Sequence, residues 1–308
     1  MKLDLTQNKP KEAVAGDLLA RDWIAGLERG LAVIEVFDED HSRMTAQQVG
    51  ERCGLSRTAA RRYLLTLQHL GYVSGDTKHF WLTPRIMRLG QSYLSSARLP
   101  RIVQPVLQRI SASLQEVVYL SVLDKGEVVY VSRNGPNRAM SSGFVLGARV
   151  PGHVTSAGML MLANLTEGQL ETWLATNNLP AYTPYTIVDV AELKKELKRI
   201  RQQGWALSEQ QFDLSFRGIA VPLRDSKRNL LGALSVLMPI QGQPSDEVVN
   251  RVVPVLQEAA QSLQNLISIS NYSEIFNVFR FASRVISSSR YGKLTGVFLT
   301  NSCVRSST

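Results

Sequence analysis

The fold of this chain is decided by residues 45–82, which read TAQQVGERCGLSRTAARRYLLTLQHLGYVSGDTKHFWL. Thr45 and Gln48 form the pattern of a capping box, in which the hydroxyl accepts a backbone N–H at a helix start and the Gln side chain reaches back to the cap. Gly54 supplies the left-handed backbone that ends a short helix, and Ser56 can cap a second helix that runs to about residue 70. The stretch therefore predicts two short helices joined by a glycine corner.

The second predicted helix has an apolar face and a basic face. Ala60, Leu64 and Leu67 recur at i, i+4 and i+7 and point to one side. The residues left on the outer side are Arg57, Thr58, Arg61 and Arg62. A helix, a corner and a second helix with basic residues at its start match the geometry of a recognition helix in the major groove of DNA. Arginine suits this task because its planar fork can bond guanine O6 and N7 together.

A two-stranded wing is predicted to follow the second helix. Residues 71–73 and 80–82 are rich in aromatic and branched side chains, and they flank a turn at residues 74–78. An arginine-rich helix alone is often only a solvated face, but here the cap, the corner and the wing agree, and no acidic residue occurs between positions 52 and 76. We therefore predict a winged helix-turn-helix that contacts double-stranded DNA through Thr45, Ser56, Arg57, Thr58, Arg61, Arg62 and Lys78.

Several stretches together resemble the IclR-type transcription regulators. They are GLERGLAVIEVF (residues 26–37), the helix-turn-helix, LGYV (residues 70–73) and LTPRIMRLGQSYLSS (residues 82–96). The form SRTAARRYLLTL (residues 56–67) is most similar to the branch that controls aromatic-acid catabolism, the protocatechuate and p-hydroxybenzoate regulators of the β-ketoadipate pathway. The resemblance, which runs from about residue 22 to 267, implies a DNA operator, a small carboxylic acid effector and a homodimer or dimer of dimers.

The chain is long enough for two domains, because 308 residues with 44% hydrophobic content can form two cores. Residues 1–20 are expected to be a flexible arm, 21–83 the winged domain, 84–99 a linker and dimerisation helix, 100–267 the effector domain, and 268–308 an atypical, poorly ordered tail. Hairpins and intervening helices predict an α+β effector domain with an antiparallel sheet. The family resemblance implies that this domain is similar to a GAF or PAS sensor fold.

Composition limits the possible classes of protein. The net charge is +9, but residues 21–90 carry ten basic and eight acidic side chains, so overall charge is weak support for DNA binding. There is no apolar run of 18 residues and no hydrophobic leader at the N-terminus, so we expect a cytoplasmic chain with no membrane span. Two distant cysteines, Cys53 and Cys303, do not suggest a disulfide framework.

The segments that flank the winged domain carry three further patterns. The apolar residues Ile24, Leu27, Leu31, Ile34 and Phe37 have helical spacing and are predicted to support the helix-turn-helix from behind. An acidic loop at residues 38–40 should be solvated, and Pro100 and Pro105 should bracket the entry to the second domain.

A ligand site is predicted where a helix starts with small residues, because its first amides can receive a carboxylate. Ser156 and Ala157 lie at such a start, and the resemblance places the carboxylate-binding loop of the family on them. It also implies ligand positions near Ser208 and Glu209 and on Gly218, Ser235 and Leu237. A glycine at 218 and a leucine at 237 would leave a larger, less polar cavity. Arg217 could supply a counter-charge or form a surface ion pair, and Met140 could line an apolar wall.

We expect no enzymatic activity, because the sequence contains no recognisable catalytic motif. The four histidines show no metal-ligand spacing, no nucleophile elbow, P-loop or dinucleotide glycine motif is present, and no cofactor is expected. A structural chromatin-like role would need a more basic winged domain. The remaining alternative is a metabolite-binding sensor protein whose helix-turn-helix serves protein contacts.

Overall fold

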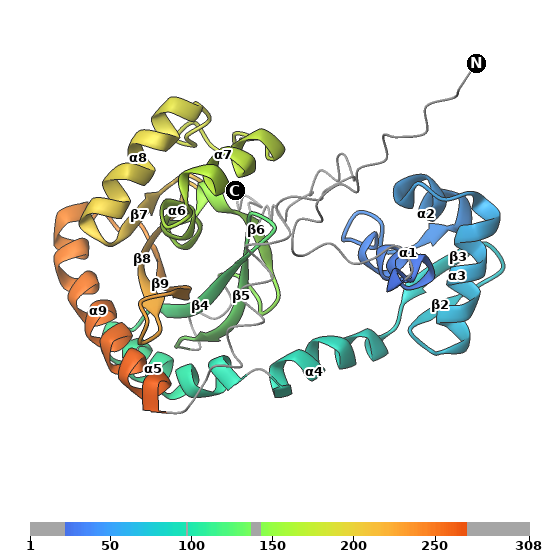
Figure 1. The fold of residues 1–308 in the computed structure, drawn as a ribbon, viewed down its shortest axis with the longest axis horizontal. Coiled ribbons are helices and arrows are strands. Elements are labelled where there is room, and N and C mark those ends of the chain that lie inside the picture. Colours follow the sequence, from blue (N-terminus) through green and yellow to red (C-terminus); the bar gives the residue numbers. More distant parts are fainter. Residues whose placement is uncertain (1–21, 97, 137–142, 270–308) are drawn as a thin grey trace, which may run out of the picture. The chain divides into compact units, whose positions relative to one another are not determined.

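The computed structural model describes residues 22–96, 98–136 and 143–269, whose fold is shown in Figure 1. The chain divides between Leu89 and Gly90 into two compact units, each described by itself below. The expected arm at residues 1–20 and all but the first two residues of the expected tail lie outside the described residues.

The N-terminal unit is a winged helix-turn-helix, as predicted. It consists of α1 (Ala25–Glu35), β1 (Met44–Thr45), α2 (Ala46–Cys53), α3 (Arg57–His69), β2 (Val73–Gly75) and β3 (His79–Leu82). Thr45 and Gln48 form the capping box of α2, and Gly54 ends α2 with a φ of 66°. The wing contains one strand that the sequence did not predict. This strand, β1, pairs antiparallel with β3 in a sheet of order β1-β3-β2.

Helix α1 meets the helix-turn-helix through a different face from the predicted one. The deeply buried residues are Val33 and Val36, whereas Ile34 and Phe37 only pack partly against the core. The other predicted core residues are exposed: Ile24 by 69%, Leu27 by 62% and Leu31 by 45%. That part of the prediction was wrong. Both stripes have helical spacing, and only the position of α2 and α3 decides which stripe is buried.

The segment after the wing is a short 3-10 turn followed by a helix. Thr83 caps the turn Pro84–Ile86, and α4 (Met87–Ser96) continues from it without burying any side chain. Helix α5 (Arg98–Leu114) begins before Pro100 and contains Pro105, so the two prolines lie inside a helix and do not bracket a domain entry. A proline in the first turn of a helix loses no helical hydrogen bond, which makes Pro100 compatible with the start of α5.

The C-terminal unit is an α+β domain with a six-stranded antiparallel sheet. After α5 it contains β4 (Val117–Asp124), β5 (Glu127–Asn134), β6 (Arg149–Pro151), a 3-10 turn (Gly152–Val154), α6 (Ser156–Ala163), α7 (Glu167–Thr176), α8 (Val190–Gln203), β7 (Ala206–Glu209), β8 (Phe216–Arg224), β9 (Leu230–Pro239) and α9 (Ser245–Ile269). The strand order is β6-β5-β4-β9-β8-β7. The predicted hairpins and helix caps are present.

The two faces of this sheet are covered differently. Helices α5 and α9 pack against each other and against one face, where they form an extensive apolar core (Figure 1). Helix α6 packs on the other face, and α8 packs on α6. Every residue of α6 is buried. Among the described residues we find no helix whose length and apolar character would let it span a lipid bilayer.

Candidate nucleic-acid interface and ligand site

Helix α3 presents its basic face to solvent. Ala60, Leu64 and Leu67 are buried, which turns the opposite side of the helix outward. The four predicted contact residues on that side, Arg57, Thr58, Arg61 and Arg62, are all exposed. Their side chains form no hydrogen bond or ion pair with another described residue, so three guanidinium groups are available to an external acceptor.

Thr45 and Ser56 have structural duties at the starts of their helices. The Thr45 hydroxyl donates to Gln48 Oε1 at 3.0 Å and accepts from the Gln48 amide at 3.3 Å. The Ser56 hydroxyl accepts from the Ala59 amide at 3.2 Å. Both hydroxyls are therefore engaged in capping. An external anion would bind at these two positions through the backbone amides of the helix N-termini more than through the side chains.

The tip of the wing is built around Asp76. Its Oδ1 accepts bonds from the amides of Lys78 and His79, each at 2.8 Å, and these bonds lower the pKa of the Asp76 carboxyl. Lys78 is left exposed at the turn. Arg43, which the sequence analysis did not single out, donates to Asp76 Oδ2 at 3.2 Å and lies 4.3 Å from the ring centre of Trp81. The sequence contains no local signal for the contacts of Arg43 with Asp76 and Trp81. They depend on the pairing of β1 with β3, and β1 was not predicted.

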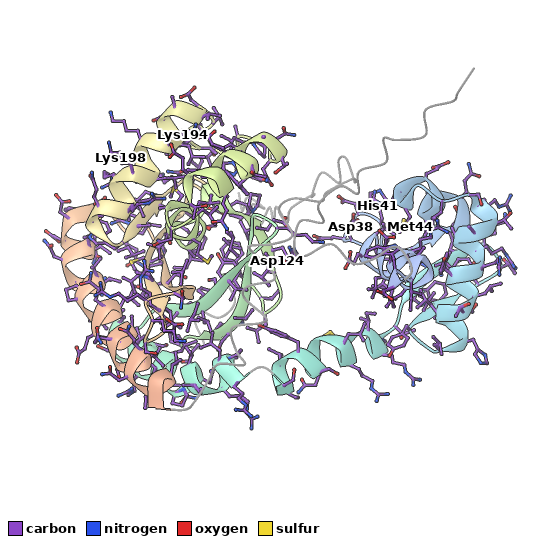
Figure 2. All side chains as sticks on the ribbon, in the orientation of Figure 1. Asp38, His41, Met44, Asp124, Lys194 and Lys198 are labelled. Atoms are coloured by element: carbon purple, nitrogen blue, oxygen red, sulfur yellow. The ribbon has the colours of Figure 1, made fainter. Side chains whose placement is uncertain are left out.

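The loop between α1 and β1 is held by a cluster of three charged or polar side chains. His41 Nδ1 donates to Asp38 Oδ1 at 2.7 Å, and Arg52 Nη2 donates to Asp38 Oδ2 at 2.7 Å. Figure 2 labels Asp38 and His41 in this loop. Burial raises the pKa of Asp38, but the bonds from His41 and the charge of Arg52 outweigh it and hold that pKa below its ordinary value. The expectation of a solvated acidic loop was therefore wrong for Asp38.

Strand register brings most of the predicted ligand residues to the α6 face of the sheet. Ser208 pairs with Gly218 and Gly218 pairs with Leu237, so these three form one row across β7, β8 and β9. Ser235 lies two residues before Leu237 on β9 and therefore points to the same side. Ser156 and Ala157, both buried, open α6 above this face.

Glu209 and Arg217 are not part of that group. They pair with each other one residue out of phase with the Ser208 row, and Arg217 also pairs with Met238 of the α5/α9 core. Alternation therefore places both side chains on the opposite face. Arg217 is buried, its Nε lies 3.1 Å from Glu209 Oε1, and its Nη2 donates to the Gln243 carbonyl at 2.9 Å. Met140 lies outside the described residues.

The start of α6 touches the sheet at Gly218. A Cβ atom at this position would lie 2.8 Å from Ser156 Oγ. The absent side chain thus makes room for α6 and does not enlarge a cavity, which corrects the interpretation drawn from the sequence. Thr155 caps the Gly158 amide at 3.0 Å, while the earlier amides of Ser156 and Ala157 have no acceptor within the helix.

A series of aromatic rings that the sequence analysis missed borders the same face. Tyr119 pairs with Ser235 across β4 and β9 and contacts Tyr130 at 4.8 Å between ring centres. The series continues through Phe144 and Phe212, at 4.6 Å and 5.6 Å, to Tyr182 at 5.1 Å. Burial raises the pKa of Tyr119 to about 12, so its hydroxyl remains a hydrogen-bond donor at neutral pH. Alternation could have found Tyr119, but Phe144, Tyr182 and Phe212 lie in loops without a periodic signal.

His153 closes the aromatic series next to the start of α6. Its ring lies 6.3 Å from that of Tyr182, and its Nε2 donates to the Pro180 carbonyl at 3.1 Å. Burial lowers the pKa of this imidazole, although the bond to Pro180 opposes the shift. A buried, neutral His153 serves to anchor the loop at Pro180. Among the described residues no group of three His, Cys, Asp or Glu side chains could hold a metal ion.

The two units together define a class of protein, a regulator that joins a winged helix-turn-helix to an antiparallel-sheet effector domain. Residues 26–77 match the IclR helix-turn-helix domain, and residues 91–265 match the C-terminal domain of bacterial transcriptional regulators of the IclR type. The chain therefore belongs to the IclR family of transcriptional regulators. Members of this family regulate transcription and are not known as enzymes.

Similar proteins include regulators of aromatic-acid genes. The p-hydroxybenzoate hydroxylase transcriptional activator of Acinetobacter baylyi is 38% identical, with 82% of this chain and 94% of that protein covered. The Pca operon regulatory protein of the same organism is 33% identical, covering 80% and 90%. Among solved structures, an IclR homolog from Microbacterium hydrocarbonoxydans in complex with 4-hydroxybenzoate is 27% identical with a TM-score of 0.62, covering 78% of this chain and 98% of that one.

Proposed function

We propose that this protein controls genes for the catabolism of an aromatic acid, by reading an operator with its winged domain and binding the acid in its effector domain. One observation carries the proposal: the start of α6 at Ser156 and Ala157, whose amides have no acceptor within the helix, lies above the row of Ser208, Gly218 and Leu237 and beside a series of aromatic rings. Relatives named for the pca operon and for p-hydroxybenzoate hydroxylase support the class of ligand.

The effector in this proposal is a benzoic acid that carries a ring hydroxyl. Its carboxylate accepts bonds from the amides of Ser156 and Ala157, where the helix dipole favours negative charge. Its ring contacts the side chains of the aromatic series, and the Tyr119 and Ser235 hydroxyls supply donors on the sheet. 4-Hydroxybenzoate and protocatechuate have this form, whereas β-ketoadipate and shorter acids lack the ring.

DNA recognition in this proposal depends on α3. Arg57, Thr58, Arg61 and Arg62 contact bases or phosphates in the major groove, and each good bidentate arginine contact is worth about 1–3 kcal/mol of base discrimination. The N-termini of α2 and α3, at Thr45 and Ser56, and the exposed Lys78 of the wing contact phosphates. Such contacts fix the orientation of the winged domain on the operator.

The regulator works as a homodimer or dimer of dimers. Residues 84–99 form the linker, and the exposed apolar residues of α1 and α4, including Leu27, Leu31, Met87 and Leu89, are covered by a second copy. Two winged domains then read a palindromic site. The acid shifts the population toward one arrangement of the sensor domains and changes the spacing of the paired winged domains. The protein acts in the cytoplasm, where its operator lies.

The effector half of the proposal is tested by calorimetric titration with 4-hydroxybenzoate and with 4-hydroxybenzyl alcohol, which has the ring and hydroxyl but no carboxylate. Because the helix start recognises the carboxylate, we expect saturable binding of the acid and at least tenfold weaker binding of the alcohol. Equal binding of both compounds would show that the amides at the start of α6 do not recognise the carboxylate. If the acid bound but changed DNA binding in no way, the alternative of a metabolite sensor with protein contacts would be favoured.

A further inference from the structure

A hollow of about 490 Å³ lies between β8 and α9, away from the effector face. The residues that line it include Arg224, Arg228 and the apolar residue Val221. Three carboxamides from α9, spaced at i, i+4 and i+7, complete one side: Gln257, Gln261 and Gln264. Val221 belongs to the α5/α9 core, and the glutamines lie on α9, while Arg224 reaches Asn164 at the end of α6.

The walls are rich in hydrogen-bond donors and contain no acidic side chain among the described residues. Neither Arg224 nor Arg228 forms an ion pair with a described carboxylate. The acidic residue next to Arg224 in the chain, Asp225, uses its two oxygens to accept bonds from the amide and the side chain of Asn229, at 2.8 Å and 2.9 Å. Two positive charges thus share the hollow without a counter-charge.

Arg224 is held in place by the protein. Its Nη1 donates to the Arg228 carbonyl at 2.9 Å, and its Nη2 donates to Asn164 Oδ1. Burial, and then the charge of Arg228, lowers the pKa of the Arg224 guanidinium. A negative charge between the two arginines would relieve both effects, because it would offset the lost solvation and the mutual repulsion.

We propose that this hollow is a second ligand site, which binds a small organic anion through the Arg224 and Arg228 guanidiniums and the carboxamides of Gln257 and Gln261 on α9. The Gln264 carboxamide instead donates to the Asp225 carbonyl at 2.7 Å and holds that wall in place. The recognised chemistry is a carboxylate or a phosphate group, and Val221 and Ala260 provide apolar contact for the rest of the molecule. This site differs from the effector site. Arg224 contacts Asn164 at the C-terminal end of α6, whereas the effector site lies at Ser156, about 12 Å away along a helix of eight residues.

The test is calorimetric titration of the full-length protein at fixed ionic strength with inorganic phosphate and, separately, with succinate. The informative variant is Arg228→Gln, because Arg228 is exposed and holds Arg224 through its backbone carbonyl, which the substitution keeps. The matched control is Lys227→Gln, which removes the same charge from the neighbouring exposed position that does not line the hollow. Melting curves verify that both variants fold.

We expect at least one anion to bind the wild type, with affinity reduced about tenfold in Arg228→Gln and unchanged in Lys227→Gln. Binding of phosphate alone would identify a phosphorylated ligand, and binding of succinate alone a carboxylate. The proposal is overturned if neither anion binds at tens of millimolar, or if Lys227→Gln weakens binding as much as Arg228→Gln, since that result indicates unspecific charge attraction. Titration of 4-hydroxybenzoate into the same variants tests the effector site separately.

Discussion

Gly218 of β8 lies against Ser156 at the start of α6, so a single methyl group added there tests how the helix is seated on the sheet. In Gly218→Ala the added methyl group would lie 2.8 Å from Ser156 Oγ, so either the Ser156 hydroxyl must rotate away or the start of α6 must shift. We expect the free energy of unfolding to fall by about 1–3 kcal/mol and effector affinity to fall with it. Denaturant unfolding and calorimetry measure these two changes.

The control for that substitution is Gly168→Ala in α7, where an added methyl group meets no atom within 4 Å. Because alanine favours a helix over glycine, this variant should be as stable as the wild type or more stable by about 0.5–1 kcal/mol. Normal stability and normal effector binding in Gly218→Ala would contradict the close contact.

His153 makes the stability of the effector domain depend on pH. Burial lowers the pKa of the folded imidazole below the ordinary value of 6.5, so the unfolded chain binds the proton more readily. The stabilisation is fully present above pH 6.5 and is lost as the pH falls from there through the folded pKa. The free energy of unfolding should therefore decrease between pH 7.5 and pH 5.5, and decrease less in His153→Gln. Parallel pH profiles for the two proteins would contradict this assignment.

At the scale of elements, α3 should carry sequence recognition and α1 should not. Arg61→Ala removes an exposed guanidinium from α3, and we expect affinity for the operator to fall by about ten- to a hundredfold, with a smaller loss on scrambled DNA. Arg29→Ala removes the same charge from the exposed side of α1. Fluorescence anisotropy with both DNAs compares them. Equal losses on both DNAs, or equal effects of the two substitutions, would mean that α3 contributes only charge.

The elements differ in how well the sequence predicted them. The helix starts at Thr45 and Ser56 were predictable because each cap is a local pattern of three or four residues. The buried face of α1 was not predictable, because the helix has two apolar stripes. Which stripe is buried depends on packing against α2 and α3, which are distant in sequence. Strand β1 has only two residues and no periodicity of its own.

The candidate ligand site shows the same division. The family resemblance placed Ser208, Gly218 and Ser235 in one site, and these three do lie on one face of the sheet, with Ser156 at the start of α6 above them. Arg217 was considered for the same site because it lies next to Gly218 in the chain. The sequence alone does not show to which face of the sheet the Arg217 side chain points. Strand register decides that question, and register depends on tertiary pairing.

At the scale of the whole molecule, assembly should depend on the exposed apolar stripe of α1. Leu27→Glu places a charge on that stripe, so the mass measured by sedimentation should fall and affinity for a palindromic operator should approach that for a half-site. Val188→Glu changes a comparably exposed apolar residue of the second unit, 50% accessible, and should leave both unchanged. An unaltered mass and operator affinity in Leu27→Glu would exclude α1 from the interface.

We expect the effector site and the DNA-binding surface of this chain to be coupled. The most direct measurement is the anisotropy of DNA from upstream of its own gene, and of scrambled DNA, at two salt concentrations, with and without 4-hydroxybenzoate. We expect a preference for the upstream DNA that survives the higher salt, and a shift in the affinity for that DNA when the acid is present. Equal binding to both DNAs, unchanged by the acid, would contradict it.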